Sequence, residues 1–394
     1  MLAKLYIDNF KVLNEFEICF TPLTVLIGEN ASGKSTVLQA IDILQALMVI
    51  DLDVYLKNRN WTVADIRSQF NKSRTIVFRA TLKLTREYNW EIELALNISA
   101  NSILVKQEKI TDDTGKLLLN FDGSKISRLN EVTENKDIFP SSLNLSSSFL
   151  KTMSIEKDMA DYPGLIEIKS FFAQVDSFEL LSPEKMRMSN RGKTNSIGMS
   201  GEKLPAFIRG LKPERKKSFL KILKRFVNSI EDIDTFVKGR PGWIEMSVKE
   251  KFGENLTKIK SEYVSDGLLR LIALASLAEI DKTSGLMLLD EIEDGINPYL
   301  AGQVVEVLQK LTRDIGRQIV ITTHSTIMLD YFNKESIVFL WRKQDGNVQA
   351  TNLFVENDKI KEMLEYMYPG EAWLNLQGSE LLAKVTGRYE DKKK

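Results

Sequence analysis

The spacing of apolar and polar residues predicts strands and one long helix in the first hundred residues. Residues 2–28 read as strands, and their last part, 21–28 (TPLTVLIG), is a continuous apolar run typical of a buried strand. Apolar residues then recur at helical spacing over 34–50. The segments 75–84 and 89–99 alternate apolar with polar positions, as antiparallel strands with one buried face do.

The pattern changes after residue 100. Residues 106–148 are polar and rich in turn-forming residues, which predicts a peripheral loop or a β extension. Residues 150–240 are mainly helical in pattern, and two strand candidates follow at 242–250 and 256–264. No heptad repeat is sustained in this region, so we expect no long coiled coil.

Composition and charge narrow the class of protein. The chain has 394 residues, of which 43% are hydrophobic, enough for a large core. Lys and Arg together number 54, as do Asp and Glu, so any DNA contact must be a local patch. Cys19 is the only cysteine, which excludes an internal disulfide. The start lacks a signal peptide and no apolar run reaches the roughly 18 residues of a membrane span, so we expect a cytoplasmic protein without a membrane partner.

A glycine-rich loop joins the apolar run to the long predicted helix. Gly28 and Gly33 bracket four residues ahead of Lys34 and Ser35, which is the G-x-x-x-x-G-K-[ST] arrangement of a phosphate-binding loop. Glycines let backbone N–H groups reach phosphate oxygens, the lysine places a positive charge on the β- and γ-phosphates, and the serine hydroxyl suits Mg²⁺. The spacing therefore predicts a nucleotide-binding site.

A second signature is the segment 285–293, GLMLLDEIE, in which an apolar strand delivers two acids. Asp290, at the end of the strand, suits Mg²⁺ held through water, and Glu291 suits the attacking water as a general base. Alone, the same residues would read as a buried strand that runs into an acidic helix start. The phosphate-binding loop upstream favours the catalytic interpretation.

Two weaker signals lie on either side of the acidic pair. Within 263–280 a Ser-Asp-Gly turn opens a strongly apolar helix. Its Ser265 and Gly267 could offer a hydroxyl and free N–H groups to a γ-phosphate, although alone the turn is an ordinary helix cap. The apolar run 318–325 ends near His324, the only histidine. A lone histidine is usually structural or exposed, but after these other elements it reads as a γ-phosphate contact.

Taken in this order, the four elements resemble the nucleotide-binding head of the ABC superfamily. Within it, the chain is most similar to the RecF/SMC-like branch and to the OLD/RecF-like predicted AAA-type ATPases that bacteria carry beside nucleases and defence genes. The resemblance covers most of the chain except about residues 100–175. The segments that carry it are KLYIDNFKVLNEFEICFTPLTVLIGENASGKST, FELLSPEKMRMS, SDGLLRLIALA, LMLLDEIEDGINP, VITTHS and GEAWL.

The resemblance implies a role for each matching position. The catalytic residues would be Glu291, Lys34 and His324, and the Mg²⁺ ligands would be Ser35, Asp290 and Gln69. The residues that contact ATP would be Asn9 and Lys11 beside the adenosine; Gly28, Glu29, Asn30, Ala31, Ser32, Gly33, Lys34, Ser35 and Thr36 in the Walker A loop; and Ser265, Asp266 and Gly267 in the signature turn. Residues 293–297 would form the D-loop.

Three features depart from the family pattern or match it weakly. The loop reads GENASGKS, without the usual proline and further glycine, yet it keeps every functional atom. Ile292 stands where a proline is usual and Asn297 where a histidine is usual, which bears on communication across a dimer. Gln69 is a polar residue ahead of a strand, which is unremarkable in itself.

The implied fold is α/β: an ABC-type ATPase head with a P-loop NTPase core sheet, an antiparallel β subdomain and an inserted, mainly helical lobe. We expect residues 1–100 to carry the N-terminal part of the head with Walker A, 101–240 to form the inserted peripheral and helical lobe, and 241–394 to complete the head. Signature turns of this superfamily act on nucleotide held by a partner. The resemblance therefore implies a homodimer that encloses ATP, with higher assembly left open, and that works as a slow conformational switch.

Three function classes stay open. The first is an ATP-driven switch that controls a separate effector, such as a nuclease, in bacterial antiphage defence. The second is a RecF-like DNA-binding ATPase in repair or replication. The third, a transporter motor, is weakest, because the turn lacks the usual double glycine. Only 325–394 follow the switch histidine, so we expect nuclease activity to come from another protein.

One segment is a candidate effector surface. The helix predicted at 213–226, PERKKSFLKILKRF, carries basic residues outside an apolar stripe. It could hold DNA phosphates or an acidic partner, although such a run is more often a solvated helix face.

Overall fold

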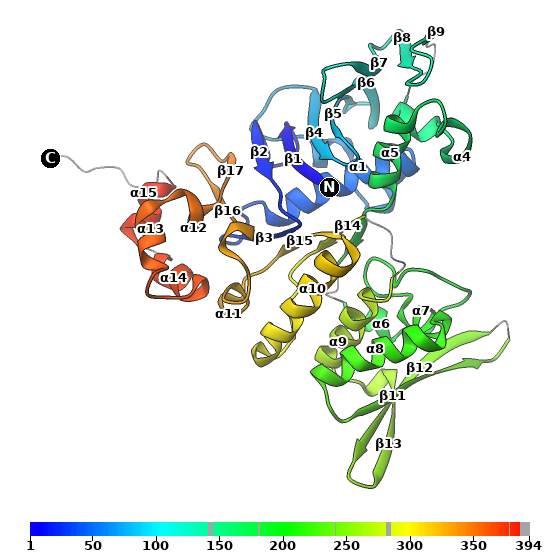
Figure 1. Ribbon diagram of the computed structural model, residues 1–394, viewed down its shortest axis with the longest axis vertical. Helices are drawn as coiled ribbons and strands as arrows, with labels where there is room; N and C mark the ends of the chain where they lie inside the picture. The colour runs from blue at the N-terminus through cyan, green and yellow to red at the C-terminus, as the bar shows by residue number, and fades with distance from the viewer. Residues whose placement is uncertain (141–144, 180–181, 241, 281–284, 378, 387–394) are drawn as a thin grey trace. The chain divides into compact units, whose positions relative to one another are not determined.

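The computed structural model describes residues 1–394 except 141–144, 180–181, 241, 281–284, 378 and 387–394. The chain divides into two compact units (Figure 1). The first unit consists of Met1–Val175, Glu335–Glu362 and Asn375–Lys394, and the second of Asp176–Lys334 and Met363–Leu374. The division of the chain into parts of the head and an inserted lobe, with boundaries at residues 100 and 240, remains a prediction from the sequence.

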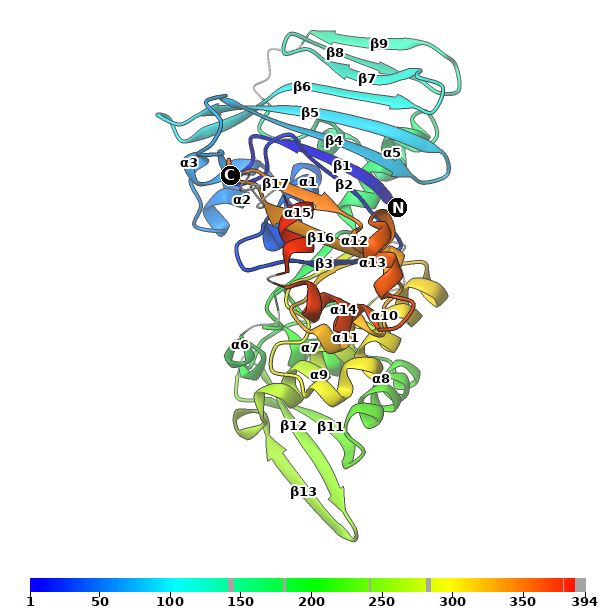
Figure 2. The same ribbon diagram turned by 90° about the vertical axis from the view of Figure 1, so that its left-hand side faces the viewer.

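A long antiparallel sheet, with strand order β2-β1-β4-β5-β6-β7-β8-β9, dominates the first unit (Figure 2). Strand β5 buries every second residue, because successive side chains of a strand point to opposite faces. Strands β6 to β9 extend the sheet, so the described part of 106–148 is a β extension rather than a loop. The strands are β1 (Leu2–Asp8), β2 (Phe16–Cys19), β4 (Thr75–Lys83), β5 (Glu87–Asn97), β6 (Ser102–Asp112), β7 (Leu117–Phe121), β8 (Lys125–Leu129) and β9 (Lys136–Pro140).

The buried face of this sheet packs against helix α5. The rings of Trp90 on β5 and Phe172 on α5 lie with centroids 5.0 Å apart. The Trp90 indole also donates to the wholly buried carboxyl of Glu108 at 2.9 Å, and burial raises the pKa of that carboxyl. The helices of this part are α1 (Lys34–Val49), α2 (Leu52–Asn58), α3 (Val63–Ile66), η1 (Phe149–Thr152), α4 (Ile155–Asp158) and α5 (Pro163–Ala173).

A second group of strands in the first unit carries the predicted phosphate loop. Strand β3 (Leu23–Ile27) is buried at every residue, as its continuous apolar sequence predicts. It pairs in parallel with β16 (Ile337–Arg342), which pairs antiparallel with β17 (Val348–Thr351). The C-terminal helices of this unit are α12 (Leu353–Glu356), α13 (Asp358–Met363) and α15 (Glu380–Val385), whereas most of α14 (Pro369–Leu376) belongs to the second unit.

Three parallel strands organise the second unit, in the order β10 (Asp176–Phe178), β14 (Leu286–Leu289) and β15 (Gln318–Thr322). Parallel strands end at the same edge of a sheet, so the acids after β14 and the histidine after β15 meet there. The helices around them are α6 (Pro183–Arg187), α7 (Leu204–Gly210), α8 (Pro213–Phe226), α9 (Asp266–Leu277), η3 (Pro298–Leu300), α10 (Ala301–Ile315) and α11 (Thr326–Leu329).

A smaller antiparallel sheet of the second unit consists of β11 (Ile230–Lys238), β12 (Trp243–Phe252) and β13 (Asn255–Lys260). Pairing of β13 with β12 ends at Lys260, opposite Ser247, and a 3₁₀ turn follows. The strand predicted at 256–264 is therefore shorter than expected.

Helix length agrees with the expectation of no long coiled coil. In the described ranges, the longest helix is α1, with 16 residues. Nor does any described helix combine the length and the apolar character that crossing a bilayer requires.

Candidate nucleotide-binding site

The predicted phosphate loop leaves buried strand β3 and enters helix α1. Gly28 has φ +149° and Gly33 has φ +100°, backbone conformations that residues with a side chain rarely adopt. A Cβ on Gly28 would lie 2.2 Å from the carbonyl oxygen of Leu340 on β16. Position 28 therefore needs glycine both for its backbone angle and for its contact with β16.

We expect Gly28→Ala to lower the free energy of unfolding by roughly 2–4 kcal/mol, because it adds a backbone clash to an unfavourable φ angle. Gly115 is the matched control, since it has φ +79° but nothing within 4 Å of an added Cβ. Gly115→Ala should cost only about 1 kcal/mol. Urea unfolding of both variants measures the difference, and equal losses would contradict the close contact with β16.

Lys34 folds back into the loop instead of pointing to solvent. The residue is 6% exposed, and its ammonium donates to the carbonyl oxygens of Gly28 at 3.0 Å and Glu29 at 3.1 Å. Helix α1 begins at Lys34 with Gly33 as its N-cap, without a side-chain cap and without an acidic residue in its first turn. The positive end of the helix and the ammonium therefore meet at the loop, which suits an anion.

The other loop residues differ in exposure. Ser32 is 2% exposed, and its hydroxyl has no hydrogen-bond partner among the described residues. Ser35 and Thr36, in the first turn of α1, are partly buried. A buried hydroxyl without a partner is a donor that a phosphate oxygen could satisfy. The exposed residues at the tip are Glu29, Asn30 and Ala31.

Asn9, expected beside the adenosine, lies inside the protein. It is 0% exposed, and its amide donates to the carbonyl oxygens of Ser73 at 3.0 Å and Thr75 at 2.8 Å. The side chain thus joins the turn after β1 to the start of β4. A nucleotide could not touch Asn9 without a local rearrangement, so this geometry does not favour its predicted role.

Lys11 is partly buried and bound to the phosphate-loop helix. Its ammonium lies 3.5 Å from the centroid of the Trp61 ring and donates to Oε1 of Gln39 on α1 at 2.8 Å. Burial, and then the nearby Arg59 guanidinium, lower the pKa of Lys11 to about 8. Gln69 belongs to the same unit but is exposed in a bend.

The lowered pKa of Lys11 predicts a pH dependence of stability. The folded protein holds the Lys11 proton less tightly than the unfolded chain, whose lysine keeps a pKa near 10.5. Where the unfolded state binds more protons, stability rises with pH. We therefore expect the unfolding free energy of the wild type to rise relative to that of Lys11→Met between about pH 8 and pH 10.5. Parallel urea titrations test this, and a difference that is flat or falls across that range would contradict the pKa.

The two acids of the predicted Walker B motif lie directly after β14, and one hydroxyl contacts both. Thr322, the last residue of β15, is 0% exposed. Its Oγ1 donates to Oδ1 of Asp290 at 2.5 Å and accepts the backbone N–H of Glu291 at 2.8 Å. Sequence reasoning gave Thr322 no role. The available signal was a polar residue at the end of an otherwise apolar strand, in the segment that ends with the switch histidine.

The predicted switch histidine and D-loop meet in the second unit. The backbone N–H of His324 donates to the carboxylate of Glu293. Both residues line a mainly apolar cavity of about 260 Å³. Asn297, which replaces the usual histidine, accepts the backbone N–H of Tyr299 at 3.0 Å and caps the short helix η3. His324 itself is exposed, so its side chain is accessible to a ligand.

The predicted signature turn opens helix α9 and contacts the D-loop. Ser265 is the N-cap, and its Oγ accepts a backbone N–H three residues later at 3.4 Å. A Cβ on Gly267 would lie 2.7 Å from the carbonyl oxygen of Gly295. One turn on, the largely buried Arg270 forms an ion pair with Asp294 at 2.7 Å. The position of the signature turn is thus fixed against the D-loop.

Asp266, the middle residue of that turn, is exposed and forms an ion pair with Arg187 of α6. The same guanidinium donates to the carbonyl oxygen of Val264 at 2.7 Å. Arg187 therefore offsets a negative charge in a turn that is expected to face phosphate. Sequence reasoning quoted the segment around Arg187 but did not link that residue to the signature turn.

The described geometry groups these predicted residues by unit. The second unit brings together the Walker B acids, the D-loop, the signature turn and His324. The Walker A loop belongs to the first unit, as do Asn9, Lys11 and Gln69.

The basic helix predicted at 213–226 is α8, and several of its charges are paired within the second unit. Lys216 pairs with Asp232 at 2.9 Å, and Lys224 pairs with Glu231 at 3.4 Å. Arg225 pairs with Glu306 of α10. These ion pairs favour an ordinary helix face over a DNA-binding surface.

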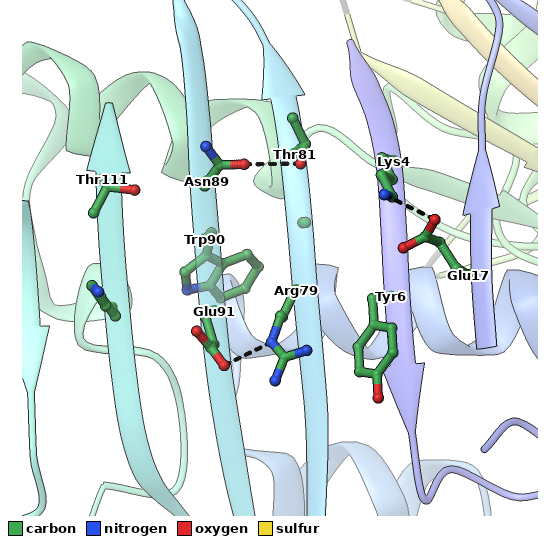
Figure 3. A pocket seen from close by; sticks show the side chains of 11 residues that line it. Lys4, Tyr6, Glu17, Arg79, Thr81, Asn89, Trp90, Glu91 and Thr111 are labelled. Atoms are coloured by element: carbon green, nitrogen blue, oxygen red, sulfur yellow. Dashed lines mark hydrogen bonds and ion pairs between the residues drawn. The ribbon is translucent and has the colours of Figure 1, made fainter. Parts of the chain in front are cut away.

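A hollow of about 270 Å³ lies on the solvent face of the antiparallel sheet (Figure 3). Four of its charged side chains are paired across neighbouring strands: Lys4 with Glu17 and Arg79 with Glu91, both at 2.8 Å. None of the predicted site residues lines it. These contacts are the cross-strand pairs expected of a solvated sheet face.

Comparison with protein-family models matches residues 23–330 to the family described as "AAA domain, putative AbiEii toxin, Type IV TA system". The match includes the Walker A loop, the signature turn, the Walker B acids and His324. It leaves out Asn9 and Lys11.

Two curated relatives are nucleases. The Old nuclease of Escherichia phage P2 is 21% identical over 399 residues, which cover 93% of this chain and 63% of that protein. The OLD nuclease of Thermus scotoductus is 32% identical over 76 residues, 19% of this chain and 13% of that protein. The chain therefore spans less than two thirds of the length of either relative.

Solved structures of SMC heads are similar in fold. A crystal structure of the SmcHead bound to the C-winged helix domain of ScpA has a TM-score of 0.52 and 14% identity, and the match covers 89% of this chain and 96% of that one. An Smc head domain with an extended coiled coil, from Pyrococcus furiosus and bound to the C-terminal domain of ScpA, has a TM-score of 0.50 and 12% identity, over 92% and 98% of the two chains. The fold is thus similar to that of an SMC head. Because the family model covers well over half of the chain, this protein belongs to that AAA-domain family, and it is similar in sequence to the OLD nucleases and in fold to SMC heads.

Proposed function

We propose that this protein binds ATP with Mg²⁺ and hydrolyses it slowly, in the manner of an ABC-type head. The observation that carries the proposal is the buried ammonium of Lys34, 3.0 and 3.1 Å from two carbonyl oxygens of the glycine loop at an uncapped helix start. Charged phosphate oxygens bind an ammonium more strongly than neutral carbonyl oxygens do. ATP would therefore draw Lys34 from the loop carbonyls to its β- and γ-phosphates.

The residues suited to Mg²⁺ are the hydroxyl of Ser35 and the carboxylate of Asp290. Mg²⁺ in nucleotide sites takes one or two protein oxygens together with phosphates and water, and each of these two side chains offers an oxygen of that kind. When bound, the ion would neutralise charge on the phosphates. Gln69 is exposed, and its amide oxygen is a hard donor of the same kind, so its role as a third ligand stays a prediction.

Glu291 is the residue we assign to proton transfer. Its carboxylate would accept the proton of the water that attacks the γ-phosphate. Its backbone, at φ +45°, is held by the bond from its N–H to Thr322. His324, exposed at the end of the neighbouring strand, would donate to a γ-phosphate oxygen.

Two copies of the head would enclose the nucleotide. The signature residues Ser265 and Asp266 are exposed, which supports a role at a surface that faces another molecule. Ser265 and Gly267 of one protomer would cap the γ-phosphate held by Lys34 and Ser35 of the other. Hydrolysis removes that group and releases the interface, so the head would work as a switch. Assembly beyond a dimer stays open.

We infer that the switch controls a separate effector, such as a nuclease, in bacterial antiphage defence. The relatives of phage P2 and Thermus are named nucleases, which supports a link between this head and nuclease activity. The SMC head structures are bound to domains of ScpA, which supports the idea that such heads serve as docking platforms. The alternative is a RecF-like DNA-binding ATPase of repair or replication, for which the ion pairs on α8 leave less basic surface.

The test is the mass of the native complex recovered from the protein's own host, with Glu291→Gln as bait in ATP and Mg²⁺. Half of the sample is treated with nuclease. A protein partner that stays bound after nuclease treatment supports the proposal that the switch controls a separate effector. Recovery of head dimers with nucleic acid alone would favour the DNA-binding alternative.

A further inference from the structure

Thr322 lies in the second unit, where the ends of β14 and β15 carry the predicted functional residues. It ends β15, it is 0% exposed, and its single hydroxyl is engaged on both sides. Oγ1 donates its hydrogen to Oδ1 of Asp290 at 2.5 Å and accepts the N–H of Glu291 at 2.8 Å. One buried side chain thus contacts the carboxylate of Asp290 and the backbone of Glu291, the two residues that the proposed mechanism uses.

The first of these bonds constrains Asp290. An unrestrained aspartate side chain can adopt several rotamers. A hydrogen bond from a buried hydroxyl to its carboxylate restricts the orientation of that carboxylate. Strand pairing supports this bond, because Leu289, just before Asp290, lies opposite Ile321, just before Thr322. The hydroxyl and the carboxylate therefore start from rigid neighbouring positions.

The second bond constrains Glu291. Its φ of +45° lies in the left-handed region that residues with side chains rarely adopt. Such a conformation persists only when surrounding contacts hold it. The Thr322 hydroxyl supplies one contact to the N–H of Glu291, and the carbonyl oxygen of Thr322 accepts the next N–H, that of Ile292, at 3.4 Å.

We propose that Thr322 is a positioning residue of the ATPase site, whose hydroxyl orients the carboxylate of Asp290 for metal binding and holds the backbone of Glu291. The inference rests on the proposed ATPase function. Because Oγ1 of Thr322 makes both contacts, loss of this atom should weaken metal binding and slow ATP turnover together. A residue that only fills the core would change stability instead.

The variants follow from the shape of the side chain. Thr322→Val keeps the volume and removes the hydroxyl, whereas Thr322→Ser keeps the hydroxyl and removes a methyl group. Thr323→Val is the matched control, because Thr323 is 2% exposed and its Oγ1 accepts the N–H of Ser325 at 3.0 Å instead of contacting the acids. Should Thr322→Val fail to fold, Thr322→Ala compared with Thr322→Ser replaces it.

The direct readout is electron paramagnetic resonance of Mn²⁺, which measures how tightly the ion binds to this chain in the presence of a non-hydrolysable ATP analogue. We expect Thr322→Val to weaken Mn²⁺ binding by about 10-fold or more and to slow ATP turnover by 10- to 100-fold. Affinity for the analogue without metal should change by less than about 2-fold, because its phosphates bind the Lys34 loop. Thr322→Ser and Thr323→Val should resemble the wild type in both assays.

Two outcomes would overturn the inference. One is wild-type Mn²⁺ binding and turnover in Thr322→Val. The other is an equal loss in Thr322→Ser and Thr322→Val, which would show that packing and not the hydroxyl matters. A wild type that neither binds the analogue nor hydrolyses ATP would refute the proposed function, a result distinct from either of these.

Discussion

Replacing Lys34 with alanine is expected to weaken ATP binding by about 100-fold or more. The change removes the only ammonium that the loop holds within hydrogen-bond distance of Gly28 and Glu29 in the described residues. A charged hydrogen bond to phosphate contributes about 3 kcal/mol, which corresponds to a loss of affinity of about 100-fold or more. Calorimetric titration with ATP and Mg²⁺ measures the effect.

The control for this prediction is a lysine on the surface of the same unit. Lys57 is exposed in the last turn of α2, so Lys57→Ala should bind ATP as the wild type does. Circular dichroism and a melting curve would establish that Lys34→Ala is folded. A folded Lys34→Ala protein with wild-type affinity would contradict the assignment of the phosphate loop.

Replacing Glu291 with glutamine is expected to separate binding from hydrolysis. The variant keeps the backbone N–H that bonds to Thr322 and the side-chain volume, so the local structure should survive. It loses the carboxylate that would accept a proton from water, and general-base catalysis contributes about 10²- to 10⁴-fold to a rate. Steady-state phosphate release should fall by that factor, while ATP affinity should change by less than about 3-fold.

Glu293→Gln is the matched control, two residues away on the D-loop. Its amide oxygen can still accept the N–H of His324, as the carboxylate of Glu293 does. We expect it to keep turnover within about 3-fold of the wild type. Wild-type turnover in Glu291→Gln, or an equal loss in both variants, would count against Glu291 as the base.

The sequence predicted those parts of the molecule whose local pattern is strong. Strand β3 is a continuous apolar run and is buried throughout, and the helix expected at 34–50 spans Lys34–Val49. The glycines of the phosphate loop have the positive φ angles that their motif requires. In these places the backbone needs of a motif and the chemistry of its residues coincide, so sequence alone could indicate them.

Features that depend on contacts between residues far apart in the sequence could not be predicted from local sequence patterns. Asn9 matches a family position, yet its burial depends on carbonyl groups at Ser73 and Thr75, more than sixty residues away. The pairing of Lys216 with Asp232 likewise depends on how α8 folds onto β11. Thr322 becomes informative only when β15 lies next to β14. Each of these depends on tertiary packing, which local periodicity does not encode.

The central claim is that ATP joins two heads into one closed state. The most direct test is the mass of Glu291→Gln in solution by light scattering, with and without ATP and Mg²⁺. Without nucleotide we expect the mass of one chain, 44.9 kDa, or that of a weakly associating monomer and dimer, and with ATP bound we expect twice the mass of one chain. A protein that binds ATP but keeps the same mass with and without it would contradict the switch.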